Sequence, residues 1–404
     1  MKRRSMMKKL VCLAVVVVFS SLFLIHGGAW AKDDIRIGFS MALTGPYAPA
    51  AKGQMEAYLV WEEMVNKKGG IFVKEFNKKL PVKFVYYDDK SEAETAVKVY
   101  EKLITDDKVD LLLAPNSTTI HFAVYPIADK YKVPIVGNTA GSTKLRDLKS
   151  RYFWYISTLA DRQMQALVDL LKALKVKTVA VVNVQEIFPA ENLEYLIPAL
   201  KKEGFDIVLQ KDYPRGVKDL IPLLSEVKAK NPDAFIGLTY VPDTFLTTTQ
   251  IQEIGFNPKF FFQLVGAAAV AYQPKFGASV EGISTFGQWS PRAKWPGAKE
   301  FLDNYVAKFK VKPDYLNSSL SYVACEIMEQ AVEKAGTLNW EKVRDVIAND
   351  EFSTIYGKLK FTGLANLSQP GMILQWQKGE IDIIWPPEVA TAKPLYPKPP
   401  WPKK

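Results

Sequence analysis

Short apolar runs alternate with amphipathic stretches along most of the chain. The first unit covers residues 35–89, where a buried strand (IRIGFSM), a Gly-Pro turn, a long helix and a second strand (VKFVYYDD) follow one another. A strand, a helix and a further strand in this order form the βαβ unit of an open parallel sheet. Ligands of such sheets bind at the carboxyl ends of the strands, so the loops that follow the strands are the candidate site.

The same alternation continues in two series, each about the size of one domain. The first series has strands at 82–87, 109–114, 133–137 and 152–155 and helices at 91–105 and 119–131. The second has helices at 161–175, 190–203, 217–230 and 243–255 and strands at 177–183, 205–210, 233–240 and 259–264. A strand at 282–290 precedes three helices without strands between them, at 297–309, 314–335 and 339–349, which we expect to cover the first sheet. The pattern predicts an α/β fold with two doubly wound lobes.

The first 31 residues have the pattern of an export signal. Residues 1–9 carry five Lys or Arg and no acid, residues 10–25 are almost wholly apolar, and Ala29 and Ala31 are small residues of the kind that a signal peptidase reads. An apolar run of 16 residues is short for a retained membrane anchor. We therefore expect cleavage after Ala31 and a secreted mature chain that begins at Lys32.

Without this signal, the charges of the chain are close to balanced. The whole chain has 53 Lys and Arg, 43 Asp and Glu and a net charge of +10, and loss of the five basic residues lowers the net charge to +5. No basic stripe is interleaved with aromatic residues, so we expect solvated charged faces and no nucleic-acid partner. Cys325 is the one cysteine of the predicted mature chain, which excludes an internal disulfide.

Patterns typical of catalysis or metal binding are missing from the sequence. His121 is the only histidine outside the predicted signal, and it has no G-x-S-x-G context and no evident third partner. We interpret His121 as a helix-surface residue, with a ligand contact as the alternative. Zinc-binding, C-x-x-C and nucleotide-binding motifs are absent as well. We predict no enzyme activity, no metal and no cofactor, and a hydrolase is only a remote alternative.

Two loops offer groups that suit a carboxylate. Ser117, Thr118 and Thr119 follow the strand at 109–114 and begin the next helix, where free N–H groups and the positive end of the helix dipole attract an anion. An ordinary N-cap explains the same residues, and the two roles are compatible. The second loop follows the strand at 133–137 and, by its pattern alone, is only a loop. Its candidate residues are Thr139, Ala140 and Ser142.

Aromatic residues in strand-end loops are candidates for the walls of the site. Flat rings grip an apolar ligand with little loss of entropy. A lone aromatic residue is as readily part of the core, so each position carries both interpretations. The candidates are Tyr47, Phe188, Tyr240 and Trp289.

The turn Thr44-Gly45-Pro46 and the run Gly69-Gly70-Ile71 match signature positions of a known family. From about residue 35 to residue 386, the chain resembles the periplasmic branched-chain (Leu/Ile/Val) amino acid binding proteins of ABC importers, which have the type I periplasmic binding protein fold. The resemblance implies two Rossmann-like lobes that close over the ligand about a three-strand hinge, with crossings near Ser157, Phe286 and Leu367. The implied parts are a signal peptide (1–31), a first lobe (32–157 and 286–366), a second lobe (158–285 and 367–390) and a Pro-rich C-terminal arm (391–404).

The resemblance also implies roles for the candidate residues. The family has a threonine where this chain has Gly141, so Thr139 or Ser142 would have to supply that hydroxyl. The implied carboxylate contacts are Ser117, Thr118 and the 137–142 loop, and the implied contacts with the ligand's side chain are Phe188 and Tyr240.

The family's acidic residue, which accepts from the ligand's ammonium group, has no counterpart here. Val265 occupies that position, in a loop at 264–269 without a charge or a hydrogen-bonding side chain. Asp161 could substitute, but an Asp before a periodic run is expected to cap the helix that follows it. An ammonium group without an acceptor is costly to desolvate. We therefore expect an aromatic or 2-oxo acid rather than a branched-chain or hydrophobic amino acid.

These observations predict a monomeric receptor in the periplasm that binds a small-molecule ligand and delivers it to an inner-membrane ABC permease. A ligand-sensing receptor domain without a transport role is the alternative. The terminal run 393–402 is rich in Pro and predicts an extended arm. We expect this arm to strap onto the second lobe, and a docking peptide for the permease is the alternative.

Overall fold

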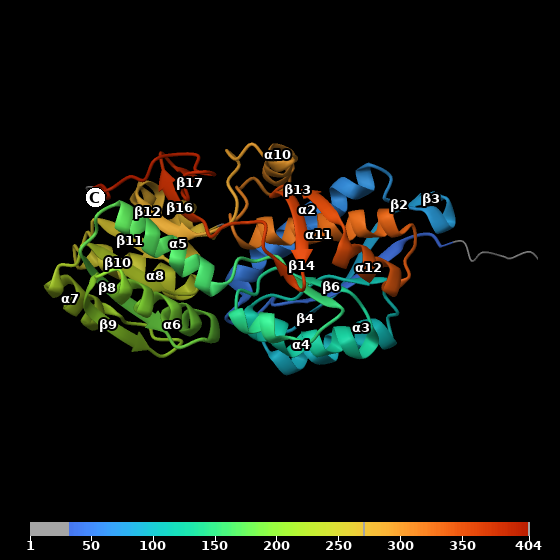
Figure 1. The fold of residues 1–404 in the computed structure, drawn as a ribbon, viewed down its shortest axis with the longest axis horizontal. Helices are drawn as coiled ribbons and strands as arrows, with labels where there is room; N and C mark the ends of the chain where they lie inside the picture. The colour runs from blue at the N-terminus through green and yellow to red at the C-terminus, as the bar shows by residue number, and fades with distance from the viewer. Residues whose placement is uncertain (1–31, 270, 403–404) are drawn as a thin grey trace, which may run out of the picture. The chain divides into compact units, whose positions relative to one another are not determined.

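The computed structural model describes residues 32–269 and 271–402. The predicted signal peptide, with Cys12 and His26, lies outside the described residues, so its cleavage stays a prediction. From Ile35 onward the chain forms one unit. Within this unit the strands gather in two groups, each with its own helices (Figure 1).

The first group contains two larger sheets and one two-stranded hairpin. In the three-stranded sheet, β1 (Ile35–Met41) lies between β4 (Val82–Asp88) and β5 (Leu111–Leu112), and both neighbours run parallel to it. The other sheet has the order β13-β14-β15-β7-β6, and its strands are β6 (Ile135–Gly137), β7 (Phe153–Tyr155), β13 (Glu351–Thr354), β14 (Gly357–Thr362) and β15 (Ala365–Asn366). The helices of this group are α2 (Ala48–Lys67), α3 (Ala93–Thr105), α4 (Thr118–Tyr131), α10 (Ala298–Phe309), α11 (Asn317–Ala335) and α12 (Trp340–Asn349).

The three late helices cover the first group, as the sequence predicted. Helix α11 packs against α2, α12 and β6, while α10 packs against α2. Helix α11 can lie deep in the group because most of its positions are apolar or small. Leu320, Val323 and Met328 are among its buried residues.

A small hairpin in the first group was not predicted. It consists of β2 (Ile71–Val73), the 3-10 turn η1 (Lys74–Phe76) and β3 (Lys78–Leu80), with Asn77 in the left-handed conformation at φ 51°. Strands of three residues are too short for a period to be recognised in the sequence.

The second group is one seven-stranded sheet with the order β17-β16-β12-β11-β10-β8-β9. Strands β8 to β12 pair in parallel, whereas β16 pairs antiparallel with β12 and with β17. The strands are β8 (Thr178–Val184), β9 (Asp206–Tyr213), β10 (Ala234–Leu238), β11 (Phe260–Gln263), β12 (Ile283–Phe286), β16 (Ile373–Gln377) and β17 (Glu380–Trp385). The helices and 3-10 turns of this group are α5 (Ala160–Ala173), α6 (Ile187–Lys202), α7 (Ile221–Lys230), α8 (Val241–Glu253), α9 (Tyr272–Phe276), η3 (Gly266–Ala268) and η4 (Gly277–Val280). The 3-10 turn η2 (Thr143–Asp147) belongs to the first group, in the loop after β6.

Central strands of this sheet have almost continuous apolar sequences because both faces are covered. Strand β10 (AFIGL) is buried at every position, and β8 (TVAVVNV) at all but its first. Helix α5 covers one face with an apolar stripe at Met164, Leu167 and Leu171, which are spaced three and four residues apart.

The chain passes between the two groups three times. It leaves the first group between β7 and α5, returns between β12 and α10, and leaves again between β15 and β16. The two doubly wound lobes that the sequence predicted are therefore present. The exact residue limits of the lobes stay predictions, and so does the hinge motion.

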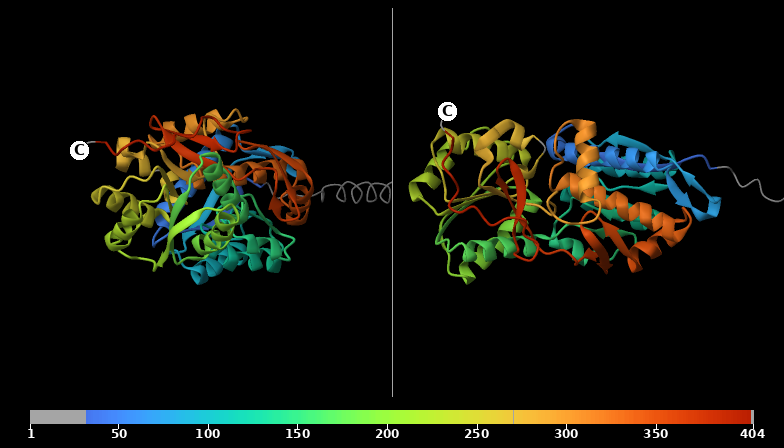
Figure 2. Two further views of the ribbon diagram at one scale, coloured as in Figure 1. Left: turned by 60° about the vertical axis from the view of Figure 1, so that its left-hand side comes forward. Right: turned by 90° about the horizontal axis from the view of Figure 1, so that it is seen from above.

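The C-terminal arm lies along the second group. In Figure 2 the red C-terminal segment runs beside the green and yellow elements of that group. The backbone N–H of Lys398 donates to the carbonyl of Lys259 at 2.7 Å, and Trp401 Nε1 donates to the carbonyl of Phe256 at 2.7 Å. The Trp401 ring also meets Phe261 edge-on at 6.0 Å between ring centres. The arm is thus packed as a strap, which was the favoured of the two alternatives.

We expect Trp401→Ala to lower the free energy of unfolding by about 2 kcal/mol, because a half-buried indole and its hydrogen bond are lost. Urea unfolding of the mature chain measures this loss, and Pro402→Ala, at an exposed neighbouring position, is the matched control. If Trp401→Ala keeps its stability but no longer supports uptake, the arm is a docking peptide.

None of the helices that the structure describes has the length and apolarity of a membrane span.

Cys325 is a free, buried cysteine within α11.

Candidate functional site

The loop between β5 and α4 presents Ser117 in an unusual backbone conformation. Ser117 is the N-cap of α4, and its φ of 70° and ψ of 150° lie in a region that non-glycine residues seldom adopt. Its backbone N–H donates to Thr139 Oγ1 at 3.2 Å, and its own Oγ accepts a long hydrogen bond from the Ile120 N–H at 3.4 Å. The N-cap interpretation is correct for Ser117, and the strained backbone marks this loop as a functional candidate.

His121 is hydrogen-bonded to the backbone of this loop. Its side chain is fully buried, and its Nδ1 lies 2.7 Å from the carbonyl oxygen of Ser117. Because a carbonyl can only accept, Nδ1 carries the proton, and Nε2 has no hydrogen-bond partner in the described part of the chain. Burial lowers the pKa of His121 to about 4. The prediction of a helix-surface residue was wrong, since His121 lies one helical turn after Ser117, on the face that turns inward.

The second loop meets the first through Gly141. The backbone N–H of Gly141 donates to Thr118 Oγ1 at 3.3 Å, and its carbonyl accepts from the Ala160 N–H at 3.0 Å. The Phe188 ring, which α6 contributes from the second group, lies directly against Gly141. A Cβ atom at position 141 would lie 2.5 Å from Phe188 Cε2. The space of a side chain at position 141 is therefore occupied by Phe188.

Residues of both groups enclose a small space between these loops, which we call the inner cavity. It has a volume of about 40 Å³, room for a few water molecules. None of the described residues that line it is charged. The lining residues are Ala50, Asn116, Ser117, Thr118, Thr139, Gly141, Ser157, Phe188, Tyr240, Val265, Phe286, Leu316, Asn317 and Leu320.

Five of the ten candidate residues from the sequence line this cavity, and the others lie elsewhere. Ser142 is buried and caps η2 by accepting from the Lys144 N–H at 3.2 Å. Trp289 is wholly buried in the core, with ring centres 5.7 Å from Tyr315 and 5.4 Å from Phe301. The candidates outside the inner cavity are Tyr47, Thr119, Ala140, Ser142 and Trp289.

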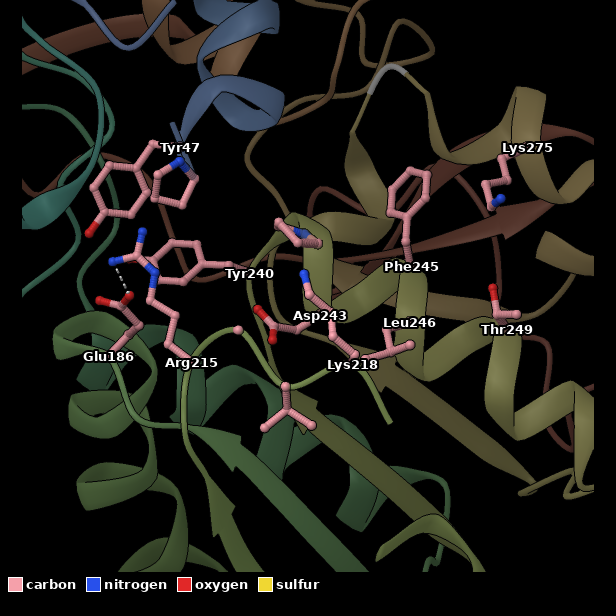
Figure 3. Close-up of a pocket in the computed structure, with 14 residues that line it drawn as sticks. Tyr47, Glu186, Arg215, Lys218, Tyr240, Asp243, Phe245, Leu246, Thr249 and Lys275 are labelled. Atoms are coloured by element: carbon pink, nitrogen blue, oxygen red, sulfur yellow. Dashed lines mark ion pairs between the residues drawn. The ribbon is translucent and has the colours of Figure 1, made fainter. Parts of the chain in front are cut away.

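A larger hollow adjoins the inner cavity beyond Tyr240, and we call it the outer pocket (Figure 3). Its volume is about 580 Å³. Tyr47 from the first group lies 6.0 Å from Tyr240 between ring centres, and the Arg215 guanidinium lies 5.1 Å from the Tyr47 ring. The lining residues are Pro46, Tyr47, Glu186, Arg215, Gly216, Val217, Lys218, Tyr240, Pro242, Asp243, Phe245, Leu246, Thr249 and Lys275.

One of the two carboxylates that line the outer pocket is already paired. Glu186 forms a salt bridge with Arg215, with 2.9 Å between Glu186 Oε1 and a guanidinium nitrogen of Arg215, and the Glu186 side chain is only 11% exposed. Glu186 lines the outer pocket but not the inner cavity. Arg215 was not predicted, because the loop after β9 has no motif and its partner Glu186 lies 29 residues earlier in the chain.

Asp161 has a different role from the predicted helix cap. Its carboxylate binds the Arg146 guanidinium through two hydrogen bonds of 2.9 and 3.0 Å, and α5 has Leu159 at its N-cap without a side-chain bond. Nearby, the Thr143 N–H donates to Glu191 Oε1 at 2.6 Å. Both contacts join the loop after β6 in the first group to helices of the second group, so they hold the groups together beside the cavity.

No cluster of three or more His, Cys, Asp or Glu that could hold a metal ion occurs among the described residues. The arrangement offers hydroxyl and amide groups at a helix N-terminus, aromatic and aliphatic walls, and no charge within the inner cavity. Such a cavity suits the binding of a small, partly apolar anion.

Comparisons with known proteins agree with this geometry. Residues 34–380 match a protein family described as periplasmic binding protein. A Brucella suis protein named Leu/Ile/Val-binding protein homolog 7 is 22% identical over 401 residues, which cover 94% of this chain and 98% of that protein. 

Two solved structures are similar in fold. The branched-chain amino acid transporter substrate-binding protein of Streptococcus pneumoniae, in complex with isoleucine, has a TM-score of 0.76 and 20% identity, and the match covers 88% of this chain and 100% of that one. A solute-binding protein of an ABC transporter from Rhodopseudomonas palustris, in complex with 3,4-dihydroxybenzoic acid, has a TM-score of 0.77 and 19% identity, over 91% of this chain and 99% of that one. These likenesses confirm the predicted fold class.

Proposed function

Because the chain belongs to the periplasmic binding protein family, as its resemblance implied, we propose that it captures a small hydrophobic carboxylate and delivers it to the permease of an ABC importer. The protein acts as a monomer in the periplasm and closes about its hinge when the ligand binds. The permease and the ATPase do the work of transport, and the binding protein performs no chemistry.

One observation supports this function above all others, namely the uncharged inner cavity at the N-terminus of α4. The ligand's carboxylate lies against Ser117 and Thr118, where the helix dipole and free N–H groups stabilise an anion. Phe188 and Tyr240 close on the ligand's apolar part from the other side.

The ligand lacks an ammonium group. Val265 lines the inner cavity where the family has an acid, and no other lining residue supplies a carboxylate. Glu186 is held by Arg215, and Asp161 by Arg146, so neither is free to accept from an ammonium group. Of the two ligands in the similar structures, the amine-free 3,4-dihydroxybenzoic acid has the chemistry that fits this cavity, and isoleucine does not.

A thermal-shift screen of refolded mature protein tests the function. We expect benzoate, phenylacetate or branched 2-oxo acids to raise the unfolding midpoint, because a ligand that binds only the folded state stabilises it. Leucine, isoleucine and valine should leave the midpoint unchanged. Stabilisation by leucine or valine would show that another group accepts from the ammonium, and no shift with either panel would contradict the proposed function.

Thr118→Val tests the placement of the carboxylate. Removal of one hydroxyl that binds a charged group costs about 1.5–3 kcal/mol, or about 10-fold to 150-fold in affinity for the best acid of the screen. Thr119→Val is the matched control, since Thr119 does not line the cavity. Calorimetric titration measures both. Equal affinities for Thr118→Val and the unchanged protein would show that the carboxylate lies elsewhere.

A further inference from the structure

The outer pocket contains most of the free space around the candidate site. It holds about 580 Å³, against about 40 Å³ for the inner cavity. Pockets that bind small molecules usually measure about 300–1,000 Å³. The outer pocket therefore has the size of a ligand compartment, and the inner cavity has room for only part of a ligand.

The two spaces meet at Tyr240, which lines both of them. Tyr47 faces Tyr240 across 6.0 Å between ring centres, from the first group of strands. In Figure 3 the two tyrosines and the Arg215 side chain lie together at one end of the outer pocket. A rigid ligand that begins at Ser117 and passes these rings would enter the outer pocket.

We propose that the outer pocket receives the far end of the same ligand, and that this ligand is an elongated aromatic acid with a second acidic group. The inference rests on the proposed function, because it takes the inner carboxylate contact as given. It adds a second compartment, and with it a preference for diacids over monoacids.

The charges of the outer pocket select an acidic group. Arg215 and Glu186 neutralise one another at 2.9 Å. Lys218 makes no hydrogen bond or salt bridge with the described residues, and its charge acts on the buried Asp243, whose pKa burial raises. Among the described residues, the Lys275 ammonium group contacts the Phe276 ring, 5.9 Å from the ring centre, and forms no hydrogen bond or salt bridge. The lining has three basic residues, Arg215, Lys218 and Lys275, and two acidic ones, Glu186 and Asp243, so positive charge is in excess.

The walls of the outer pocket suit an aromatic or extended apolar body. Val217, Pro242, Phe245 and Leu246 supply apolar surface to the lining of the outer pocket. Phe245 packs edge-on against Tyr272 at 5.5 Å, which fixes the orientation of its ring. Fixed aromatic walls bind a flat ligand with little further loss of entropy.

Matched pairs of ligands test the second compartment. Calorimetric titration compares terephthalate with 4-carbamoylbenzoate, and 1,4-phenylenediacetate with its monoamide, so that each pair differs only in the distal charge. We expect at least one diacid to bind about fivefold or more tightly than its monoamide, as a charge-assisted contact with a partly exposed lysine allows.

Lysine variants locate the effect. In the double variant Lys218→Met/Lys275→Met, the ratio of the affinity for the diacid to the affinity for its monoamide should fall close to one. The affinity for the monoamide itself should change less than about twofold. Lys230→Met, at an exposed position on α7 outside the pocket, should keep the preference. A monoamide that binds as tightly as its diacid, or a preference that persists in the double variant, overturns the inference and leaves the proposed function intact. If no acid of either kind binds, the proposed function itself fails.

Discussion

Gly141→Ala will weaken binding of the best acid from the screen by about tenfold or more. A methyl group at position 141 would lie 2.5 Å from Phe188 Cε2, so the ring must move before the second group can close on the first. Overpacking of this kind costs about 1–3 kcal/mol, and each 1.4 kcal/mol is tenfold in affinity. Calorimetric titration measures the loss.

A second change should recover the binding that Gly141→Ala loses. Leucine at position 188 lacks the outer ring atoms, so we expect Gly141→Ala/Phe188→Leu to bind better than Gly141→Ala alone, although Phe188→Leu by itself weakens binding. Small-angle scattering of the ligand-free proteins gives an independent measure, with a larger radius of gyration for Gly141→Ala if closure is blocked. Independent, additive effects of the two changes would show that Gly141 and Phe188 do not share this space.

His121 makes the stability of the protein depend on pH. Burial lowers its folded-state pKa from 6.5 to about 4, so between these values the unfolded chain binds a proton that the folded chain does not. The stabilisation from a neutral His121 is fully present above pH 6.5 and is lost as the pH falls towards 4. The loss reaches about 3 kcal/mol.

His121→Asn isolates this effect, because asparagine places a donor near the Nδ1 position and does not titrate. The difference in unfolding free energy between the natural chain and the variant, from urea unfolding, should shrink by about 3 kcal/mol between pH 7 and pH 4. Asp314, whose pKa burial raises to about 6, acts in the opposite direction in both proteins and cancels in this difference. Parallel pH profiles would show that His121 is not the group responsible.

Much of the fold could be predicted because its elements are long and periodic. Helix α5 and strand β8 appeared in the sequence within a few residues of their observed bounds. The β2–β3 hairpin and the antiparallel pair β16–β17 were missed, since short or late strands depend on partners that the sequence does not reveal. Helix α7 begins at Ile221, not at residue 217, with Pro222 in its first turn.

The site was predictable where it depends on strand ends and less so where it depends on side-chain direction. Ser117 and Thr118 follow a strand and begin a helix, which places them at the cavity, but Thr119 is turned about 100° further around the helix. The spacing of four residues between Ser117 and His121 was a usable signal, because such residues share one helix face. The partnership of Arg146 with Asp161 had no local signal, since it joins two lobes.

The chain passes between its two groups three times, and this topology has a consequence for biosynthesis. The seven-stranded sheet is incomplete until β16 and β17, which end at Trp385, join β12, which ends at Phe286, and the strands made before it. The first group likewise waits for β15 at residues 365–366. At about 5–20 residues per second of synthesis, most of the chain emerges from the ribosome before either lobe can be finished. Such a delay keeps the nascent polypeptide open and threadable, which is the state that a translocation channel requires.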